Sequence, residues 1–404
     1  YWYVPLHGWV LMSDSSRDSL RSAMGSAVRR IGRHHKVAGL SFPTVGEGAR
    51  YRLGGNDNWL AGFWTGLLWL AYAATADSSL RVHAESLLPS FEKRLREGTH
   101  ITHDLGFLFA LSARAQWQLV HDARARDLAI EAAEQLARRY RPEPRFIQAW
   151  GQVGSPVEGG RFIIDTMMNL PLLFWAADQG GHARYREIAY HHAETTLRYL
   201  MRPDGSSYHT YLFDPDTWSP IGPRTHQGYS DDSLWSRGQA WAIYGFAVAA
   251  QWCGDERFLC ASRSAARRFL SELPADGLPW WDLRLPAHAP HFLDSSAAAV
   301  AAGGLLRLSR LTGEEEDGEF RSAALSLLER LTSRCFEKGS EGLGLLNHGA
   351  LHVPRGLTVD GFIIFGDYFF LEALLAADGA APDFWGPPLS PTPEHGRDGS
   401  RGGN

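Results

Sequence analysis

The stretch "NWLAGFWTGLLWLAYAA" (residues 58–74) is apolar or small around nearly its whole helical circumference. The next stretch, "SSLRVHAESLLPSFEKRLREG" (78–98), has a charged face and an apolar face, the latter formed by Leu80, Ala84, Leu87, Leu88, Phe91 and Leu95. A helix that is apolar all round must be buried on every side, whereas an amphipathic helix covers a core with one face. The two stretches therefore predict a buried helix followed by a half-exposed helix that packs on it.

This pair of patterns repeats along the chain. The apolar segments, most of which begin with a polar or Gly-rich cluster, lie at 58–74, 103–117, 165–177, 236–250, 294–309 and 366–377. The amphipathic segments lie near 14–34, 78–98, 122–140, 182–201, 255–273 and 315–336. Six buried helices that alternate with six covering helices predict an all-α fold, a double-layered (α/α)6 barrel.

The domain organisation follows from the same pattern. We expect residues 1–380 to form a single barrel, and residues 381–404, which are rich in Pro, Gly and Ser, to be a disordered tail. Long connections at 140–164, 202–235 and 274–293 lead into the N-terminal ends of buried helices. Because long connections commonly carry functional groups, we expect the site at this end of the barrel.

The composition argues against several classes of protein. The 404 residues carry a formal net charge of -5 and contain no Lys/Arg tract, which argues against a nucleic-acid partner. No apolar run approaches the length of a membrane span, so we expect a water-soluble protein with no membrane partner. Three scattered cysteines and the lack of a visible signal peptide suggest a cytoplasmic location. With no HExxH motif and no Cys/His cluster, the sequence predicts no metal and no cofactor.

One carboxylate, Asp165, stands in the apolar run "GRFIIDTMMNLPLLFWAAD". Either it caps the helix that follows, since Asp is a preferred N-cap, or it is kept in a dry place because its proton is used. The same two interpretations apply to Asp104, Asp294 and Asp367. In the predicted barrel Asp104 and Asp165 would face one cavity. Paired carboxylates in an aromatic-rich cavity are typical of acid/base chemistry on sugars.

Two further stretches, "SYHTYLFDPDTW" (207–218) and "RTHQGYSDDSLWSRGQAWAIYGFA" (224–247), add the polar and aromatic candidates His209, Gln227, Trp235, Arg237 and Trp241. An Arg on a buried helix needs an anion, and either Asp231 or Asp232 would supply one without any ligand. Several tryptophans either stack on sugar rings or pack in the core, namely Trp59, Trp64, Trp69, Trp150, Trp235 and Trp241.

Five motifs taken together resemble one family. "ITHDLGF", "IIDTMMNL", "YHTYLFD", "WSRGQAWAIYGF" and "FGDYFFLEALL" look like those of the unsaturated glucuronyl hydrolases, glycoside hydrolase family 88, and the resemblance runs over nearly the whole chain. It implies the (α/α)6 fold. It also implies removal of the 4,5-unsaturated uronic acid that polysaccharide lyases leave at the non-reducing end of oligosaccharides, glycosaminoglycan-type disaccharides among them.

The resemblance also implies roles for residues of this chain. Asp165 is similar to the general acid/base and Asp104 to the second essential carboxylate. The predicted substrate contacts are His103, Trp150, His209, Gln227, Trp235, Arg237, Trp241 and Trp59. The stretch "NHGALHVPRGLTVDGFIIF" (347–365) lacks the Ser and Lys pattern of members that favour sulfated substrates, so no sulfate preference is implied.

The implied chemistry explains why a carboxyl would be kept dry. The substrate contains a C4=C5 vinyl ether, and its cleavage starts by protonation at C4, which needs a neutral acid. An Asp in water has a pKa of about 3.9, and burial or a nearby carboxylate raises that value. We expect both influences at Asp165.

Three other functions remain open on the same barrel. The first is an unsaturated rhamnogalacturonyl hydrolase, which differs only in the sugar. The second is an inverting hydrolase of neutral sugars, with Asp104 and Asp165 as acid and base. The third is a barrel that binds sugars without turnover.

Overall fold

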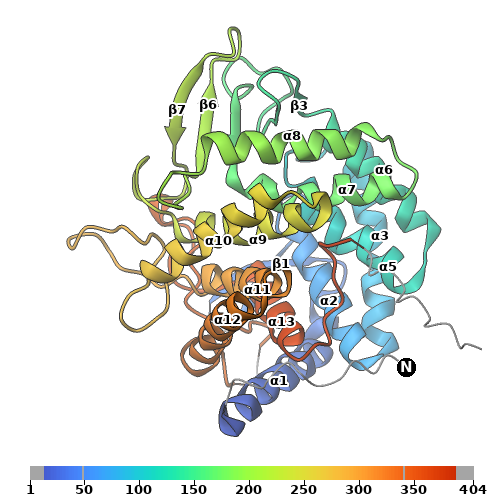
Figure 1. Cartoon of the computed structure of the whole chain (residues 1–404). Coiled ribbons are helices and arrows are strands. Elements are labelled where there is room, and N and C mark those ends of the chain that lie inside the picture. The colour runs from blue at the N-terminus through green and yellow to red at the C-terminus, as the bar shows by residue number, and fades with distance from the viewer. Residues whose placement is uncertain (1–12, 48–49, 340–341, 388–404) are drawn as a thin grey trace, which may run out of the picture.

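Two layers of helices form a closed ring in the computed structural model, which describes residues 13–47, 50–339 and 342–387 (Figure 1). Within these residues, six inner helical segments alternate with six outer helices, which confirms the predicted (α/α)6 barrel. The inner segments are α2 (Ala61–Thr75), the run of α4 (Leu105–Phe109), η1 (Ala110–Arg114) and α5 (Ala115–Val120), the pair η2 (Ile164–Met168) and α7 (Leu170–Asp178), α9 (Ser236–Cys253), α11 (Ser295–Leu311), and α13 (Ile364–Ala377). The outer helices are α1 (Asp14–Ala38), α3 (Ser78–Glu97), α6 (Ala123–Ala137), α8 (Arg184–Tyr199), α10 (Glu256–Ser271) and α12 (Glu314–Arg334).

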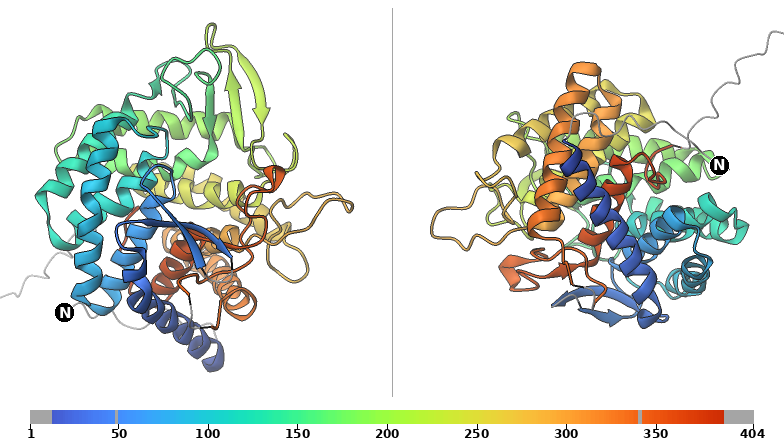
Figure 2. Two further views of the ribbon diagram at one scale, coloured as in Figure 1. Left: turned by 180° about the vertical axis from the view of Figure 1, so that it is seen from behind. Right: turned by 90° about the horizontal axis from the view of Figure 1, so that it is seen from below.

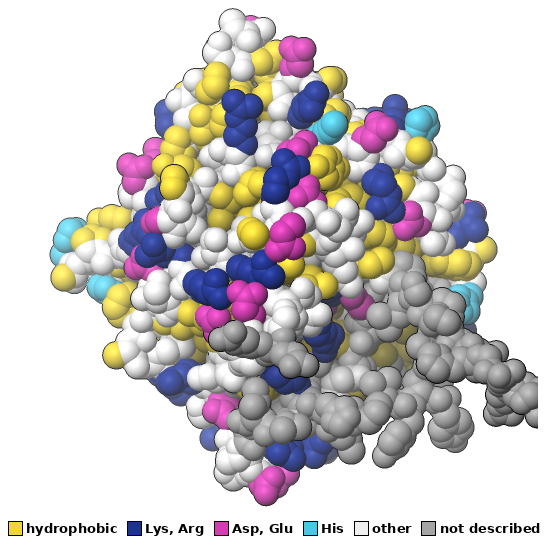
Figure 3. Space-filling model, viewed as in Figure 1, with side chains coloured by type: hydrophobic (Ala, Val, Ile, Leu, Met, Phe, Trp, Pro, Cys, Tyr) yellow, Lys and Arg dark blue, Asp and Glu magenta, His cyan; other side chains and the backbone are white. Residues whose placement is uncertain are grey.

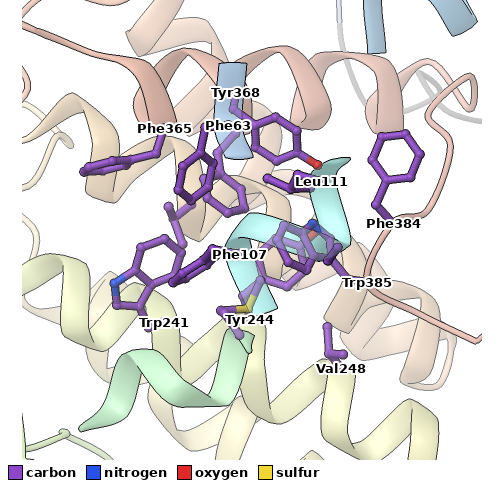
Figure 4. Close-up of a cluster of buried hydrophobic side chains, with 14 of the residues drawn as sticks. Phe63, Phe107, Leu111, Trp241, Tyr244, Val248, Phe365, Tyr368, Phe384 and Trp385 are labelled. Carbon is purple, nitrogen blue, oxygen red and sulfur yellow. The ribbon is translucent and has the colours of Figure 1, made fainter. Parts of the chain in front are cut away.

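The inner helices are buried all round, as their composition requires. Every residue of α2 from Ala61 to Ala71 is buried, and α9 is buried over most of its length. Aromatic rings from different inner helices meet along the barrel axis, where Phe107 lies 5.2 Å from Phe63 and 5.3 Å from Trp241 between ring centroids (Figure 4). This aromatic cluster fills the interior, so the centre of the barrel is a packed core.

The outer helices are exposed on one face and begin at short turns. Asp77, Asp122 and Asp255 each follow an inner helix and accept a backbone N–H in the first turn of α3, α6 and α10. Ion pairs join neighbouring outer helices, such as Arg257 of α10 to Glu194 of α8 at 2.9 Å. Acidic and basic side chains are interspersed over this face in Figure 3. Exposed pairs of this kind contribute little each, so the inner core dominates stability.

Strands occur only in the connections that lead from an outer helix into an inner one, as far as the described residues go. They form three small sheets: β2 (Arg50–Gly54), β1 (Phe42–Glu47) and β8 (Phe362–Ile363); β3 (Tyr140–Arg141) and β4 (Phe146–Ile147); β5 (Arg161–Ile163), β6 (Thr210–Phe213) and β7 (Pro220–Arg224). Figure 2 (left) shows the hairpin β1–β2 in blue across the middle of the view and the strands β6 and β7 in yellow-green above it. The long connections therefore gather around the N-terminal ends of the inner helices, as predicted.

The ring closes between the two ends of the chain. Helix α1 packs on both α12 and α13, and α13 packs on α2. Figure 2 (right) shows α1 running along the outside of the barrel beside α12. No helix among the described residues has the length and apolarity needed to cross a bilayer.

The predicted start of the tail at residue 381 is wrong. Phe384 and Trp385 are fully buried, and the Trp385 indole donates a hydrogen bond of 2.7 Å to Glu372 on α13 (Figure 4). Two large aromatic rings bury enough apolar surface to order a segment whose composition otherwise resembles a linker. Residues 388–404, the rest of the predicted tail, lie outside the described residues.

Two glycines bring other inner helices close to η2. A Cβ on Gly106 of α4 would overlap the backbone of Asn169, and a Cβ on Gly245 of α9 would overlap Met167. Asn169 also accepts the N–H of Phe107 at 2.7 Å. The segment that carries Asp165 is therefore held between α4 and α9 by close packing.

Candidate active site

Asp165 lies in the first turn of η2 and does not cap it. The segment has no side-chain cap, and Oδ2 of Asp165 has no hydrogen-bond partner among the described residues although the atom is buried. The side chain is 14% exposed. Burial, with the charge of Asp104 as a second cause, raises the pKa of Asp165 to about 7, and Arg237 opposes the rise. The capping interpretation is therefore wrong for Asp165, and this carboxyl can hold a proton near neutral pH.

The other acidic residues at the starts of inner helices separate into different roles. Asp294 is a true cap, because Oδ1 accepts the N–H groups of Ser296 and Ala297 at 3.1 and 3.3 Å. Asp367 is held by backbone N–H groups at 2.8 Å and by the hydroxyl of Tyr51 at 2.7 Å. Both carboxylates are saturated within the fold, which leaves Asp104 and Asp165 as the candidates for chemistry.

Asp104 precedes α4 without capping it and accepts the Thr102 hydroxyl at 3.0 Å. Burial raises the pKa of Asp104, whereas the opposing influences, which lower it, come from His100, Thr102, Arg94 and Arg139. Asp165, in contrast, faces the negative charge of Asp104. The charge of Asp104 raises the pKa of Asp165, whereas the groups around Asp104 oppose the effect of its burial, so Asp165 is the carboxyl that is better placed to keep a proton.

His103 joins the two carboxyl-bearing segments. Its Nδ1 lies 3.0 Å from the hydroxyl of Thr166, the residue after Asp165, and its Nε2 lies 3.4 Å from Oδ1 of Asp104. Burial lowers the pKa of His103 well below its usual value, so the ring is neutral. His103 thus links the segments that carry Asp104 and Asp165, and its contact with substrate stays a prediction.

His209 is placed beside Asp165 by the pairing of β5 with β6. Its carbonyl accepts the N–H of Ile164, and its Nδ1 accepts the backbone N–H groups of His226 and Gln227 at 3.1 and 3.3 Å. A nitrogen that accepts two fixed N–H groups carries no proton, so the ring proton is on Nε2. Burial keeps the pKa of His209 well below its usual value. His209 is therefore a neutral donor, with Nε2 3.9 Å from Oδ2 of Asp165.

Arg237 has an anion within the fold, but it is neither of the two that the sequence offered as alternatives to a ligand. Arg237 pairs with Asp294 at 2.7 Å and not with Asp231 or Asp232, and both side chains of this pair are buried. Its two Nη atoms also donate to the carbonyls of Ala350 and Leu351 at 2.7 Å and to Oε1 of Gln227 at 3.1 Å. The sequence could not identify Asp294, since it is distant in the chain and also caps α11.

The aromatic candidates fall into two groups. Trp150, which lies 6.4 Å from His103 between ring centroids, and Trp235, which lies 4.1 Å from His209, are beside the polar site residues. Trp59 is half-buried and stacks on Phe365 at 5.1 Å. The other three candidate tryptophans pack in the core with no exposed surface, namely Trp64, Trp69 and Trp241. The ring nitrogen of Trp241 has no partner among the described residues and points away from the aromatic cluster (Figure 4).

Comparison with known proteins agrees with this arrangement. Residues 35–271 match the model of Glycosyl Hydrolase Family 88. An unsaturated glucuronyl hydrolase of Bacillus sp. strain GL1 is 42% identical over 370 residues, which cover 90% of this chain and 98% of the relative. The chain belongs to glycosyl hydrolase family 88.

Other members of the family are similar over almost their full length. An unsaturated chondroitin disaccharide hydrolase of Streptococcus pyogenes serotype M1 is 36% identical, with 89% of this chain and 91% of the relative covered. The crystal structure of an unsaturated glucuronyl hydrolase from Streptococcus agalactiae superposes with a TM-score of 0.85 at 32% identity, covering 93% of this chain and 98% of that one. The similarity in fold therefore extends over nearly the whole barrel.

The structure of this family member adds residues that sequence reasoning missed. His226 and His352 lie 4.8 Å apart between ring centroids, and His226 also lies 4.9 Å from Trp150. Both ring nitrogens of His352 lack partners among the described residues, and burial lowers the pKa of His352 to about 4. For His226, the sequence offered one indication, its position next to Gln227. The stretch that contains His352 was considered only because it lacks a Ser and Lys pattern.

No metal centre is formed by the described residues. Among them, no three or more His, Cys, Asp and Glu side chains are arranged to hold an ion. The groups available for chemistry in this part of the chain are the two carboxyls, the neutral histidines and the tryptophans around them.

Proposed function

We propose that this enzyme removes the 4,5-unsaturated uronic acid from the non-reducing end of lyase-generated oligosaccharides by hydrating the C4=C5 double bond. The observation that carries the proposal is the state of Asp165, a buried carboxyl with a pKa of about 7 and no partner on Oδ2 among the described residues. The names of the relatives support the same class of substrate, since they include unsaturated glucuronyl and unsaturated chondroitin disaccharide hydrolases.

In the first step Asp165 donates its proton to C4 of the unsaturated ring. The double bond supplies the electron pair for the new C–H bond, and positive charge develops on C5 and the ring oxygen. The ionised Asp104, whose charge already acts on Asp165, stabilises that positive charge electrostatically. His209 presents an N–H rather than a lone pair at this point, so it does not compete for the proton.

In the second step Asp165, now a carboxylate, takes a proton from the water that adds to C5. This returns the acid to its starting state and forms a hemiketal at C5. The hemiketal opens, and the rest of the saccharide leaves from C1 as an alcohol. Asp165 is therefore acid and base in turn, which requires a pKa near the working pH.

A panel of lyase-made disaccharides tests the proposal, with loss of the ultraviolet absorbance of the double bond as the readout. Chondroitin-type, hyaluronan-type and heparin-type disaccharides, with and without sulfate, define the linkage and sulfation preference. An unsaturated rhamnogalacturonan disaccharide forms a separate arm. Turnover of that arm alone would assign the other unsaturated sugar. Binding of every member with no turnover would favour a sugar-binding barrel.

The proposal also covers the setting in which the enzyme works. We propose a small carbohydrate as the substrate, and we propose no nucleic-acid or membrane partner. Cys253, Cys260 and Cys335 are free thiols, which fits the reducing cytoplasm that we propose as the location. Fractionation of the source cells, with the disaccharide assay on each fraction, tests the location.

A further inference from the structure

Arg139 is a buried cation at the edge of the site, just after α6. It is 2% exposed, and no carboxylate oxygen of the described residues lies within 4.0 Å of it. Its guanidinium donates to five backbone carbonyls. These belong to Gln148 (from Nε, 2.9 Å), Ile101 (from Nη1, 2.8 Å), and Ala149, Trp150 and Gly151 (from Nη2, 3.2, 3.0 and 3.1 Å).

These carbonyls lie on the two segments that carry site residues. Ile101 is two residues before His103, and the run 148–151 contains Trp150. The segments also meet directly, since the N–H of His103 donates to the carbonyl of Ala149 at 3.1 Å. Arg139 therefore binds both of these segments where they meet, because the guanidinium can donate to several carbonyls at once.

The charge of Arg139 acts on Asp104. Burial lowers the pKa of Arg139 to about 10, and Asp104 is the carboxylate that opposes this fall. In return, the pKa of Asp104 is lowered by His100 first, then by Thr102 and Arg94, and least by Arg139. The hydrogen bonds to the backbone, and not this weak interaction with Asp104, therefore distinguish Arg139.

We propose that Arg139 is a positioning residue whose guanidinium fork holds Trp150 beside His103. The inference rests on the proposed function. It assigns no contact between Arg139 and substrate, because the donors are used on the protein's own backbone.

Several titratable and polar groups besides Arg139 surround Asp104. They are Arg94 on α3, His100, Thr102 and His103 before α4, and Asp165 on η2. Arg94 donates to the carbonyls of Asn56, Asn58 and His100. Arg94 therefore also acts on the charge of Asp104, but none of these bonds reaches the Trp150 segment.

Three variants test this positioning action. Arg139→Lys keeps the charge and loses the fork. Arg139→Met loses both. Gln148→Met keeps the charge and removes the amide that donates to the carbonyl of Trp150 at 2.7 Å. The matched control is Arg114→Lys, because Arg114 is also buried and donates to backbone carbonyls, but those of Pro171 and Gly386.

The measurements are kcat and KM across pH on the best substrate of the panel, with thermal unfolding of each variant. We expect Arg139→Lys and Gln148→Met to raise KM by about tenfold, with the acidic limb of kcat/KM unmoved. Arg139→Met should raise KM at least as much, since it keeps none of the donors that hold the Trp150 segment. Arg114→Lys should change neither quantity.

Several outcomes would overturn the inference while the wild-type enzyme remains active. One is an unchanged KM in a folded Arg139→Met enzyme. If Arg139→Met does not fold, unchanged KM values in Arg139→Lys and Gln148→Met refute the positioning action on their own. The same KM change in Arg114→Lys would reduce the effect to general destabilisation. Lack of wild-type turnover on the whole panel would instead refute the proposed function.

Discussion

Replacing Asp165 with Asn should stabilise the folded protein at alkaline pH and abolish turnover at every pH. Asn has nearly the same shape as Asp but has no acid proton and no charge. Ionisation of Asp165 in the folded protein places a charge in a buried position near the charge of Asp104. This unfavourable placement raises its pKa to about 7. The substitution removes this unfavourable charge along with the catalytic acid.

The size of the effect follows from the pKa shift. The pKa of Asp165 rises from 3.8 to about 7, a difference of about 3 units at roughly 1.4 kcal/mol each, so burying the charge costs up to about 4 kcal/mol. Because the folded state binds the proton more tightly, stability is lost as the pH rises from 3.8 and the loss is complete above about 7. Between pH 5 and pH 8 the stability gap between Asp165→Asn and wild type should therefore widen by about 2–3 kcal/mol.

Equilibrium urea unfolding of both proteins at pH 5, 6, 7 and 8 measures this gap. The change of the gap with pH is the decisive quantity, because packing differences between Asp and Asn contribute equally at each pH. Asp294→Asn serves as the control, since it weakens the cap of α11 and the pair with Arg237 and should destabilise the fold. A gap for Asp165→Asn that stays constant within about 0.5 kcal/mol would show that Asp165 is ionised throughout, and would refute its role as a neutral acid.

Three further predictions concern the same end of the barrel. In wild-type enzyme, kcat/KM should fall about tenfold per unit above pH 7 as Asp165 loses its proton, and a rate that is flat to pH 9 would contradict this. Gly106→Ala should destabilise the fold by about 1–3 kcal/mol, because the added methyl overlaps the backbone of Asn169; unfolding equal to wild type would refute the close approach. Arg237→Lys should lower stability by about 1–3 kcal/mol, since one ammonium cannot replace the bonds to Asp294 and the neighbouring carbonyls. It should also raise KM if Arg237 contacts substrate. Unfolding equal to wild type would contradict the observed pairing.

The helical architecture was predictable because buried and half-exposed helices differ in the pattern of apolar residues along the sequence. The apolar run 58–74 and the amphipathic run 78–98 became α2 and α3, and the same relation held around the ring. The start of the tail was not predictable, because composition averages over a window and hides a pair such as Phe384 and Trp385 among Pro and Gly. Local patterns thus revealed the helices but not a short segment that packs across the chain.

The candidate site was predictable only where a residue type was unusual for its surroundings. Asp165 was conspicuous in an apolar run, yet Asp294 looked similar and proved to be a cap. Distinguishing them requires the hydrogen-bond partners, which depend on tertiary contacts. Arg139 and His352 gave no signal, because an Arg at the end of an amphipathic helix and a His in a long loop are ordinary in sequence.

The most direct test of the account follows the proton that Asp165 delivers. With the reaction run in heavy water, the acid exchanges with solvent before each turnover, so early product should carry deuterium bonded to C4. Displacement at C1 would protonate only the leaving oxygen, and that label washes out. NMR and mass spectrometry of product taken early, before slow enolisation next to the C5 ketone, read the result. Deuterium at C4 supports hydration by Asp165, and early product without deuterium at C4 would contradict it.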